Sequence, residues 1–284
     1  MNKEKLAQLK LEGFINQRDT RYFTLRIIAV SGIMSSSEMN NVLSIANIYG
    51  RGYISFTTRL GIEIPWIREE DIESVKEDLR AFNLRAGGTG KKVRPIVSCK
   101  GTVCTHGLID TQKLCAELHK KYFAHDLPAK FKIGIVGCPN NCAKTQLNDL
   151  GFMGQRLPKF EESKCKACGA CVKVCKAGAL DKVEGKTKFN EEKCLGCGKC
   201  INACHFDAME TKKEGVAVFL GGKFGRKYKI GDKLQAVFSL DEIEEVTQKV
   251  MDCYAENGNG GERFGDMIDR IGIENLKAQL LNKL

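Results

Sequence analysis

The chain has 284 residues, 14 of them cysteine, and a formal net charge of +10; this length allows one large domain or two to three small ones. No apolar run reaches the roughly 18 residues that a membrane-spanning helix needs, and the charged N-terminal residues lack the apolar stretch of a signal peptide. We therefore expect a cytoplasmic protein without a membrane span, whose cysteines stay reduced and serve metal sites rather than disulfides.

Residues 1–85 predict a small α+β domain. A short helix and a loop are expected in residues 1–20, followed by a strand over 22–30. Ser35 and Glu38 form a capping box, which predicts the start of a helix. Two short strands and a second amphipathic helix are expected before residue 84. This β-α-β-β-α order is typical of an α+β half-domain.

Two cysteine pairs follow this domain. Cys99 and Cys104 end one apolar run, Cys138 and Cys142 end the next, and residues 112–123 between them predict an amphipathic helix. A helical crossover brings the ends of two parallel strands together, so the four thiols are expected at one edge of a sheet. In a reduced chain, four converging cysteines favour an iron–sulfur or metal site.

Cys115 is the alternative to Cys104 as a ligand. It lies beside Leu114 in the expected helix, near Leu118, and free cysteine is commonly buried in such a position. The sequence favours a core position for Cys115 but leaves the choice between the two cysteines open. Cys253 has no cysteine nearby in the sequence and is expected to be structural.

Residues 164–204 contain two copies of the unit C-x2-C-x2-C-x3-C, 29 residues apart. This is the bacterial ferredoxin signature for two 4Fe–4S clusters, in which the last cysteine of each run binds the other cluster. Zinc is the alternative, although two complete runs of this type are rarely zinc sites. The expected ligand sets are Cys165, Cys168, Cys171 and Cys204 for one cluster, and Cys194, Cys197, Cys200 and Cys175 for the other.

After this unit the sequence returns to strands and helices. Residues 216–220 predict a strand that ends at a Gly-Gly-Lys sequence, and Ser239 with Glu242 forms a second capping box before an amphipathic helix. We therefore expect the ferredoxin unit to be inserted into a larger α/β domain. The expected domains are 1–85, 86–160 together with 213–284, and 161–212.

These motifs resemble those of the sirohaem-dependent sulfite and nitrite reductases over nearly the whole chain. Cys138-Pro-Asn-Asn-Cys142 matches the family's C-x3-C pair, whereas Cys99 to Cys104 is one residue shorter than the usual C-x5-C. Thr57-Thr58-Arg59-Leu60 is similar to the family's TTRQ stretch, and residues 149–154 to its DxGxxG continuation. Within the family, the chain most resembles the anaerobic sulfite reductase C type and the small dissimilatory-type reductases with an inserted ferredoxin.

The resemblance implies a ferredoxin-like half-domain, a sirohaem and 4Fe–4S domain, and an inserted domain with two more clusters. It implies six-electron reduction of sulfite to sulfide, with nitrite reduction to ammonia as the alternative, and Cys142 as the bridge from cluster to sirohaem iron. Electrons would come from a donor subunit or a ferredoxin. The chain carries one half-domain unit where the family commonly has two, so a homodimer or larger complex is expected. A polyferredoxin carrier without sirohaem is the remaining alternative.

The resemblance also implies the residues of the site. Lys130 and Lys132 match a basic pair that faces the open side of the sirohaem, and alternation along a strand puts both on one face. Arg94 matches a further arginine, and Arg26 is the nearest substitute for one that aligns with Ile28. The residues expected to contact sirohaem are Thr57, Thr58, Arg59, Lys100, Gly101, Asn140, Asn141, Cys142, Gly221, Gly222 and Lys223.

The positive charge could also indicate nucleic-acid binding. Each 4Fe–4S cluster with its four thiolates carries a net charge of about −2, and sirohaem carries about eight carboxylates. Anionic cofactors and an anionic substrate therefore account for the basic residues. No nucleic-acid-binding motif is present, and we expect no such partner.

Overall fold

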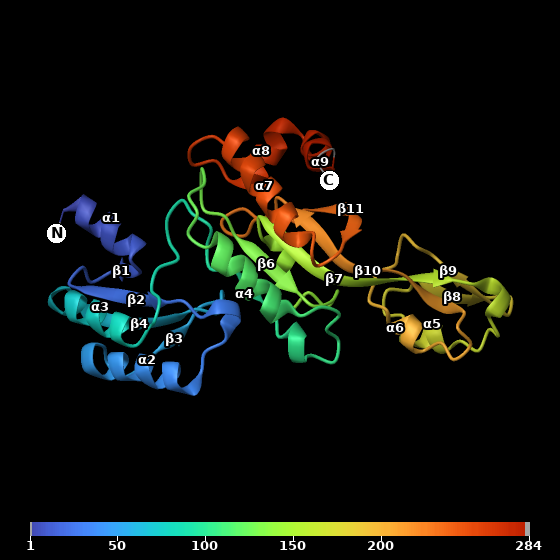
Figure 1. Ribbon diagram of the computed structural model, residues 1–284, viewed down its shortest axis with the longest axis horizontal. Helices are drawn as coiled ribbons and strands as arrows, with labels where there is room; N and C mark the ends of the chain where they lie inside the picture. Colours follow the sequence, from blue (N-terminus) through green and yellow to red (C-terminus); the bar gives the residue numbers. More distant parts are fainter. Residues whose placement is uncertain (1, 282–284) are drawn as a thin grey trace.

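The computed structural model describes residues 2–281; residues 1 and 282–284, at the outer ends of two expected domains, lie outside the described residues. Three regions follow one another along the long axis of the molecule (Figure 1). They are an N-terminal sheet with helices, a central sheet with helices, and a smaller region that extends from the central sheet. None of the described helices has the length and apolar character needed to cross a membrane.

The N-terminal region is an antiparallel sheet in the order β1-β2-β4-β3. Its apolar faces and helices share one core, which includes Phe23, Ile45 and Val75. The Ser35–Glu38 capping box is present at the start of α2. Strand β1, which the sequence analysis did not predict, adds an edge to the sheet. The elements are α1 (Lys3–Leu11), β1 (Phe14–Asn16), β2 (Tyr22–Ile27), η1 (Val30–Gly32), α2 (Ser36–Tyr49), β3 (Ser55–Phe56), β4 (Ile62–Arg68), η2 (Glu69–Asp71) and α3 (Ile72–Ala81).

The central region is a five-stranded sheet in the order β11-β10-β7-β6-β5. Strands β5, β6 and β7 run parallel, and β10 and β11 are antiparallel to their neighbours. The expected helix between the two cysteine pairs is α4, which connects β5 to β6. The elements are β5 (Val97–Ser98), η3 (Gly101–Val103), α4 (Thr111–Tyr122), β6 (Ile133–Val136), η4 (Thr145–Leu147), β7 (Leu150–Phe160), β10 (Met209–Leu220), β11 (Asp232–Phe238), α7 (Ile243–Asn257), α8 (Phe264–Ile271) and α9 (Ile273–Leu281).

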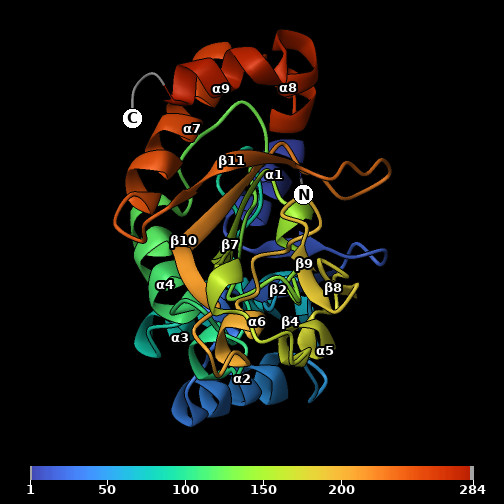
Figure 2. The ribbon, with the colours of Figure 1, turned by 90° about the vertical axis from the view of Figure 1, so that its right-hand side faces the viewer.

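The two faces of the central sheet differ in what covers them. Helices α4, α7 and α8 pack on one face, and α4 and α7 lie along the same side of β7 and β10 in Figure 2. Alternation along the strands turns Val136, Met153 and Phe219 to the other face, where Cys99 packs against them. The helices therefore bury one face, and the loops that carry the two cysteine pairs lie against the other.

Strands β7 and β10 are much longer than their neighbours. They stay paired from Leu150 opposite Leu220 to Phe160 opposite Met209, so the sheet continues beyond β6 as a two-stranded ribbon. The expected domain limit at 212/213 falls inside β10, because the polar residues at the start of this strand give no apolar pattern. The ribbon carries segment 161–208, which contains η5 (Glu162–Lys164), α5 (Ala170–Val174), β8 (Leu180–Val183), β9 (Lys186–Phe189) and α6 (Lys199–Asn202).

Candidate active site

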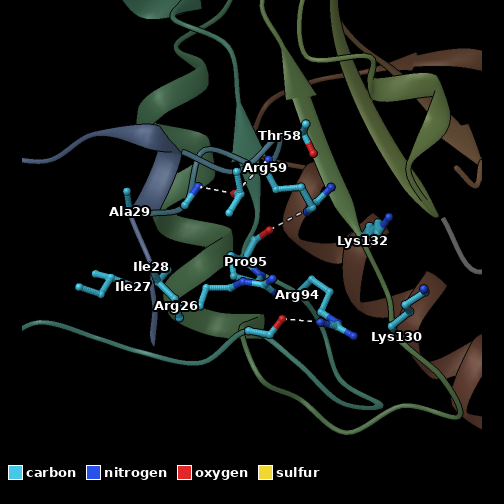
Figure 3. Close-up of a pocket in the computed structure, with 13 residues that line it drawn as sticks. Arg26, Ile27, Ile28, Ala29, Thr58, Arg59, Arg94, Pro95, Lys130 and Lys132 are labelled. Atoms are coloured by element: carbon cyan, nitrogen blue, oxygen red, sulfur yellow. Dashed lines mark hydrogen bonds between the residues drawn. The ribbon is translucent and has the colours of Figure 1, made fainter. Parts of the chain in front are cut away.

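A cavity of about 250 Å3, here the basic cavity, lies between the N-terminal region and the central sheet (Figure 3). Its walls come from the end of β2, the β3–β4 turn, the segment before β5 and the segment before β6. The structure thus brings together side chains that lie far apart in the sequence, including every basic residue expected at the substrate. The lining residues are Arg26, Ile27, Ile28, Ala29, Thr57, Thr58, Arg59, Gly61, Gly88, Arg94, Pro95, Lys130 and Lys132.

Lys130 and Lys132 stand on the same side of the segment that enters β6, as their alternation predicts (Figure 3). Phe131 between them is fully buried in the core. Burial lowers the pKa of Lys132 to about 8, and the nearby Arg59 and Arg263 guanidiniums add to this shift. The pKa of the more exposed Lys130 is lowered for the same main reason. The surroundings of both lysines therefore disfavour their protonated, positively charged form.

Two arginines in the cavity wall are held by neutral oxygen atoms. Arg59 donates from Nη1 to Asn148 Oδ1 (2.9 Å) and from Nη2 to the carbonyl oxygen of Pro95 (2.9 Å). Arg94 donates from Nη1 to the carbonyl oxygen of Gly88. Burial lowers the pKa of both, that of Arg59 to about 10. Among the described residues, the buried Nε of each has no hydrogen-bond partner, so each retains a donor for an anion.

Arg26 differs from these two arginines. It lines the cavity together with Ile28, but its guanidinium forms an ion pair with Glu63 on the neighbouring strand β4, at 2.6 Å. The two residues are cross-strand partners, so the pair follows directly from the sheet register. The structure therefore places Arg26 at the expected cavity and gives its charge a carboxylate partner.

An ion pair beside the basic cavity received no role in the sequence analysis. Asp149 has no exposed surface, and Arg263 Nη2 lies 2.8 and 2.7 Å from its two carboxylate oxygens. Oδ2 of Asp149 also accepts the backbone N–H of Lys132, at 2.9 Å. Burial acts to raise the pKa of this carboxyl, and the Arg263 guanidinium opposes it. The signal in the sequence was the position of Asp149 at the start of the DxGxxG motif.

A second cavity of about 420 Å3, here the thiol cavity, adjoins the first. Thr58 lines both, so the two hollows meet at this residue. The four cysteines of the two pairs line the thiol cavity, and Cys99 Sγ accepts the backbone N–H of Gly137 at 3.2 Å. The expected contact residues that also line it are Lys100, Gly101, Asn140 and Asn141; the cysteines are Cys99, Cys104, Cys138 and Cys142.

Cys104, and not Cys115, is therefore the residue that joins the other three thiols. Cys115 belongs to α4 and is fully buried in the core, with its Sγ 3.4 Å from the carbonyl oxygen of Ile96. The chain after Cys104 returns close to the loop between the two cysteines, since a Cβ atom on Gly107 would lie 1.9 Å from the carbonyl oxygen of Gly101. Among the described residues, no three His, Cys, Asp or Glu side chains meet closely enough to hold a single metal ion.

Segment 161–208 contains two further small cavities, each lined by four cysteines. The first cysteine set is Cys165, Cys168, Cys171 and Cys204, and the second cysteine set is Cys175, Cys194, Cys197 and Cys200. The structure thus groups the thiols as the crossed ferredoxin pattern predicts. Backbone N–H groups point at the sulfur atoms of Cys165, Cys175 and Cys194 at 3.3 to 3.4 Å.

The thiols in each set lie near enough to affect one another. Burial, together with the neighbouring Cys194 and Cys197, raises the pKa of Cys200 to about 12. Four thiolates at this spacing would repel one another, whereas bound iron supplies the positive charge that permits deprotonation. Each set of four thiols therefore fits an iron–sulfur cluster as a ligand set.

The Gly221-Gly222-Lys223 sequence lines neither the basic cavity nor the thiol cavity, which differs from the expectation. A Cβ on Gly222 would lie 2.2 Å from the carbonyl oxygen of Gln146, so this glycine allows the end of β10 to pass η4. Lys223 forms an ion pair with Asp266 of α8. Gly222 does permit a close approach of the backbone, but the group approached is the backbone of η4 and not a cofactor cavity.

Comparison with protein families gives two matches that together cover most of the chain. Residues 89–284 match the nitrite and sulphite reductase 4Fe-4S domain, and residues 15–82 match the nitrite/sulfite reductase ferredoxin-like half domain. These matches confirm the expected half-domain and the expected 4Fe–4S domain.

Individual proteins agree with this assignment. The chain is 31% identical over 303 residues to one of the subunits of the anaerobic sulfite reductase of Salmonella typhimurium, covering 99% of this chain and 86% of the relative. It is 36% identical over 264 residues to the coenzyme F420-dependent sulfite reductase of Methanocaldococcus jannaschii, covering 92% of this chain but only 42% of that longer relative.

A solved structure shows the same fold. Dissimilatory sulfite reductase I superposes with a TM-score of 0.73 at 21% identity, over 91% of this chain and 69% of the other. The matched domains, the relatives and the shared fold agree on one conclusion. The chain belongs to the nitrite and sulfite reductase family of oxidoreductases.

Proposed function

We propose that the chain is the catalytic subunit of a sirohaem-dependent sulfite reductase, which takes sulfite to sulfide with six electrons. The observation that carries this proposal is the junction of the basic cavity and the thiol cavity at Thr58. Reduction of an anion by several electrons needs a cationic pocket directly beside an electron store. A carrier that only passes electrons onward has no need of the basic cavity, which disfavours the polyferredoxin alternative.

The residues present fit these cofactors. Besides the Nε atoms of Arg59 and Arg94, that of Arg263 is buried with no hydrogen-bond partner among the described residues. Buried donors of this kind normally find an acceptor, and the carboxylates of sirohaem would supply several. The thiols of Cys99, Cys104, Cys138 and Cys142 would hold a 4Fe–4S cluster. When bound, the two groups supply stored electrons and an iron that holds the anion, coupled through Cys142.

The side chains of the basic cavity would bind the anion and supply protons. Lys130, Lys132 and Arg94 would hold its oxygen atoms by charge-assisted hydrogen bonds. A pKa of about 8 lets Lys132 donate a proton near neutral pH more readily than an ordinary lysine does. Arg26, whose charge is already balanced by Glu63, would shape the cavity wall.

Nitrite reduction to ammonia is the second candidate, because the same cavity suits either anion and the matched family covers both activities.

The two cysteine sets of segment 161–208 would each hold one more 4Fe–4S cluster and would take electrons from a donor subunit or a ferredoxin. We further propose that the protein works in the cytoplasm, as a homodimer or within a larger complex that completes the site.

The first test is an anaerobic absorption spectrum with extraction of the cofactor and an iron determination. The proposal expects extractable sirohaem and roughly 13 iron atoms per chain, from three four-iron clusters and one haem iron. Protein without tetrapyrrole and with about 8 to 12 iron atoms would be a carrier, and the proposal would fail. Turnover on sulfite and on nitrite, compared by kcat/KM, then decides between the two substrates.

The lysine pair provides the matching test by mutation. Lys130→Ala with Lys132→Ala should lower kcat/KM for sulfite by at least about 100-fold, the range seen when positioned acid–base groups are removed. Sirohaem and iron contents should stay unchanged. Lys159→Ala, an exposed lysine on the distant part of β7, is the control. Unchanged kinetics in the double variant would remove both lysines from the pocket.

A further inference from the structure

A third cavity, here the bridging cavity, lies between the thiol cavity and segment 161–208. Its volume is about 330 Å3, and its lining includes Cys138 with Asn140 on one side and Cys197 with Asn202 on the other. Cys138 also lines the thiol cavity, and Cys197 also belongs to the second cysteine set. The first cysteine set contributes no residue to this lining. Of the two sets in the segment, the second therefore faces the thiol cavity.

Two adjacent residues of β7 hold the second set in this place. Gln155 is buried and donates from Nε2 to the carbonyl oxygen of Leu195, at 2.9 Å. The backbone N–H of Arg156 donates to the carbonyl oxygen of Gly196, at 2.8 Å. Both acceptors lie between Cys194 and Cys197. The loop that carries these two cysteines is thus bonded along the edge of the ribbon.

The Arg156 side chain adds further hydrogen bonds between the ribbon and the segment. Its Nε donates to Thr211 Oγ1 on β10 (2.8 Å), and its Nη1 donates to Asn202 Oδ1 in α6 (3.1 Å). Arg156 also lines the bridging cavity, and Glu214 lies 3.5 Å from its Nε. One side chain therefore ties the ribbon to the helix that follows Cys197.

The same strand also fixes the thiol cavity. Residues 150–153 of β7 pair with β6, and β6 ends two residues before Cys138. Only a few residues of one continuous strand, at about 3.3 Å each, separate this pairing from Gln155 and Arg156. Because hydrogen bonds on both sides hold β7 in register, the spacing between Cys138 and Cys197 is set by the strand.

We propose that Arg156, supported by Gln155, is a positioning residue for electron transfer, and that it makes the second cysteine set the one that delivers electrons to the thiol cavity. Each transfer moves one electron, with no bond formed or broken at the cysteines. An external low-potential one-electron donor supplies the electrons at the first set, whose Cys168 is exposed. The transfer step rests on the proposed function, but the order of the sets does not.

The order is tested by electron paramagnetic resonance on the reduced, intact chain, without substrate. Cys168→Ser perturbs the first set and Cys197→Ser the second. A reduced cluster close to the one at Cys138 broadens the signal of the latter by magnetic coupling. This broadening should remain in Cys168→Ser and disappear in Cys197→Ser. The reverse pattern would overturn the proposed order. This readout needs neither sirohaem nor turnover, so it separates the inference from the proposed function.

The positioning role is tested with Arg156→Ala, compared with Lys159→Ala on the same strand. After reduction, mixing with sulfite should oxidise the clusters of segment 161–208 at least tenfold more slowly in Arg156→Ala, with unchanged iron content, and at the wild-type rate in Lys159→Ala. A wild-type rate in Arg156→Ala would overturn the role. If Arg156→Ala loses iron, Asn202→Ala is measured instead, because it removes only the hydrogen bond between Arg156 and Asn202. A slower rate with unchanged iron content would support the role, and a wild-type rate would overturn it.

Discussion

The central sheet and segment 161–208 bury very different amounts of apolar side chain. One face of the sheet and its helices share a core that includes Phe131, Tyr254 and Phe264, whose rings meet at centroid distances of 5.3 to 5.6 Å. The buried residues of the core at the segment are Cys171, Leu180 and Cys200 together with Met209 of β10, so half of them are proposed ligands. Small regions with so little core usually depend on metals or disulfides for stability.

The two regions differ in the source of the free energy that stabilises their folded state. The central sheet has the buried area to stay folded by itself. In the segment, the free energy of cluster binding would replace the missing core, because binding to the folded state alone stabilises that state. Variants that act on cores and variants that act on clusters should therefore affect different halves of the molecule.

Iron removal should have the largest effect. An anaerobic chelator should unfold segment 161–208 and leave the central sheet folded, since the segment has only a small core and half of its buried residues are proposed ligands. Hydrogen exchange followed by mass spectrometry would report this as lost protection in 161–208 and kept protection in α7 and β6. Equal protection of the segment before and after iron removal would contradict the comparison.

The second largest loss of stability should follow when the buried Asp149–Arg263 ion pair of the central region is broken. Asp149→Asn leaves Arg263 without its carboxylate, and breaking a buried pair from one side costs about 3–5 kcal/mol. Urea unfolding of the central region measures the change. Replacing both residues with apolar ones should cost less than Asp149→Asn, because no buried charge is then left unpaired. A change below about 1 kcal/mol in the single variant would mean that water reaches the arginine.

The paired cysteines of the central region sharpen the comparison further. Cys104→Ser should remove about four iron atoms per chain, the content of one cluster, because its thiol lines the thiol cavity. Cys115→Ser should keep all iron and cost about 1–3 kcal/mol, because a buried hydroxyl replaces a thiol in the core. Iron analysis and thermal unfolding of the two variants decide the ligand. Equal iron loss in both would reject the assignment.

The smallest effect concerns pH. Lys132 loses its charge as pH rises through about 8, so the affinity for sulfite should fall above that pH. An unfolded lysine titrates near pH 10.4, so between about 8 and 10.4 the unfolded chain binds more protons, and this group's contribution to stability rises with pH. The KM for sulfite measured from pH 7 to 9.5 tests the loss of charge. Lys132→Arg keeps its charge and should show a flat profile across this range.

The sequence predicted the features that depend on local spacing. The capping box at Ser35, helix α4 and both cysteine sets of segment 161–208 lie where expected, since each is set by residues within one short stretch or one repeat. The Asp149–Arg263 pair joins residues 114 positions apart, and no local pattern links them. The place of Gly221 and Gly222 was missed because a glycine reveals a close approach without identifying its partner.

The ribbon of β7 and β10 makes the segment a module of the fold. Phe160 and Met209 face each other across the ribbon, so the chain leaves and returns at neighbouring positions. A two-residue hairpin turn has the span needed to close this gap. The whole segment could then be exchanged for another electron carrier, or for a short turn, with little disturbance of the basic cavity. If the segment supplies electrons as proposed, the ribbon would let that supply diversify while the basic cavity is retained.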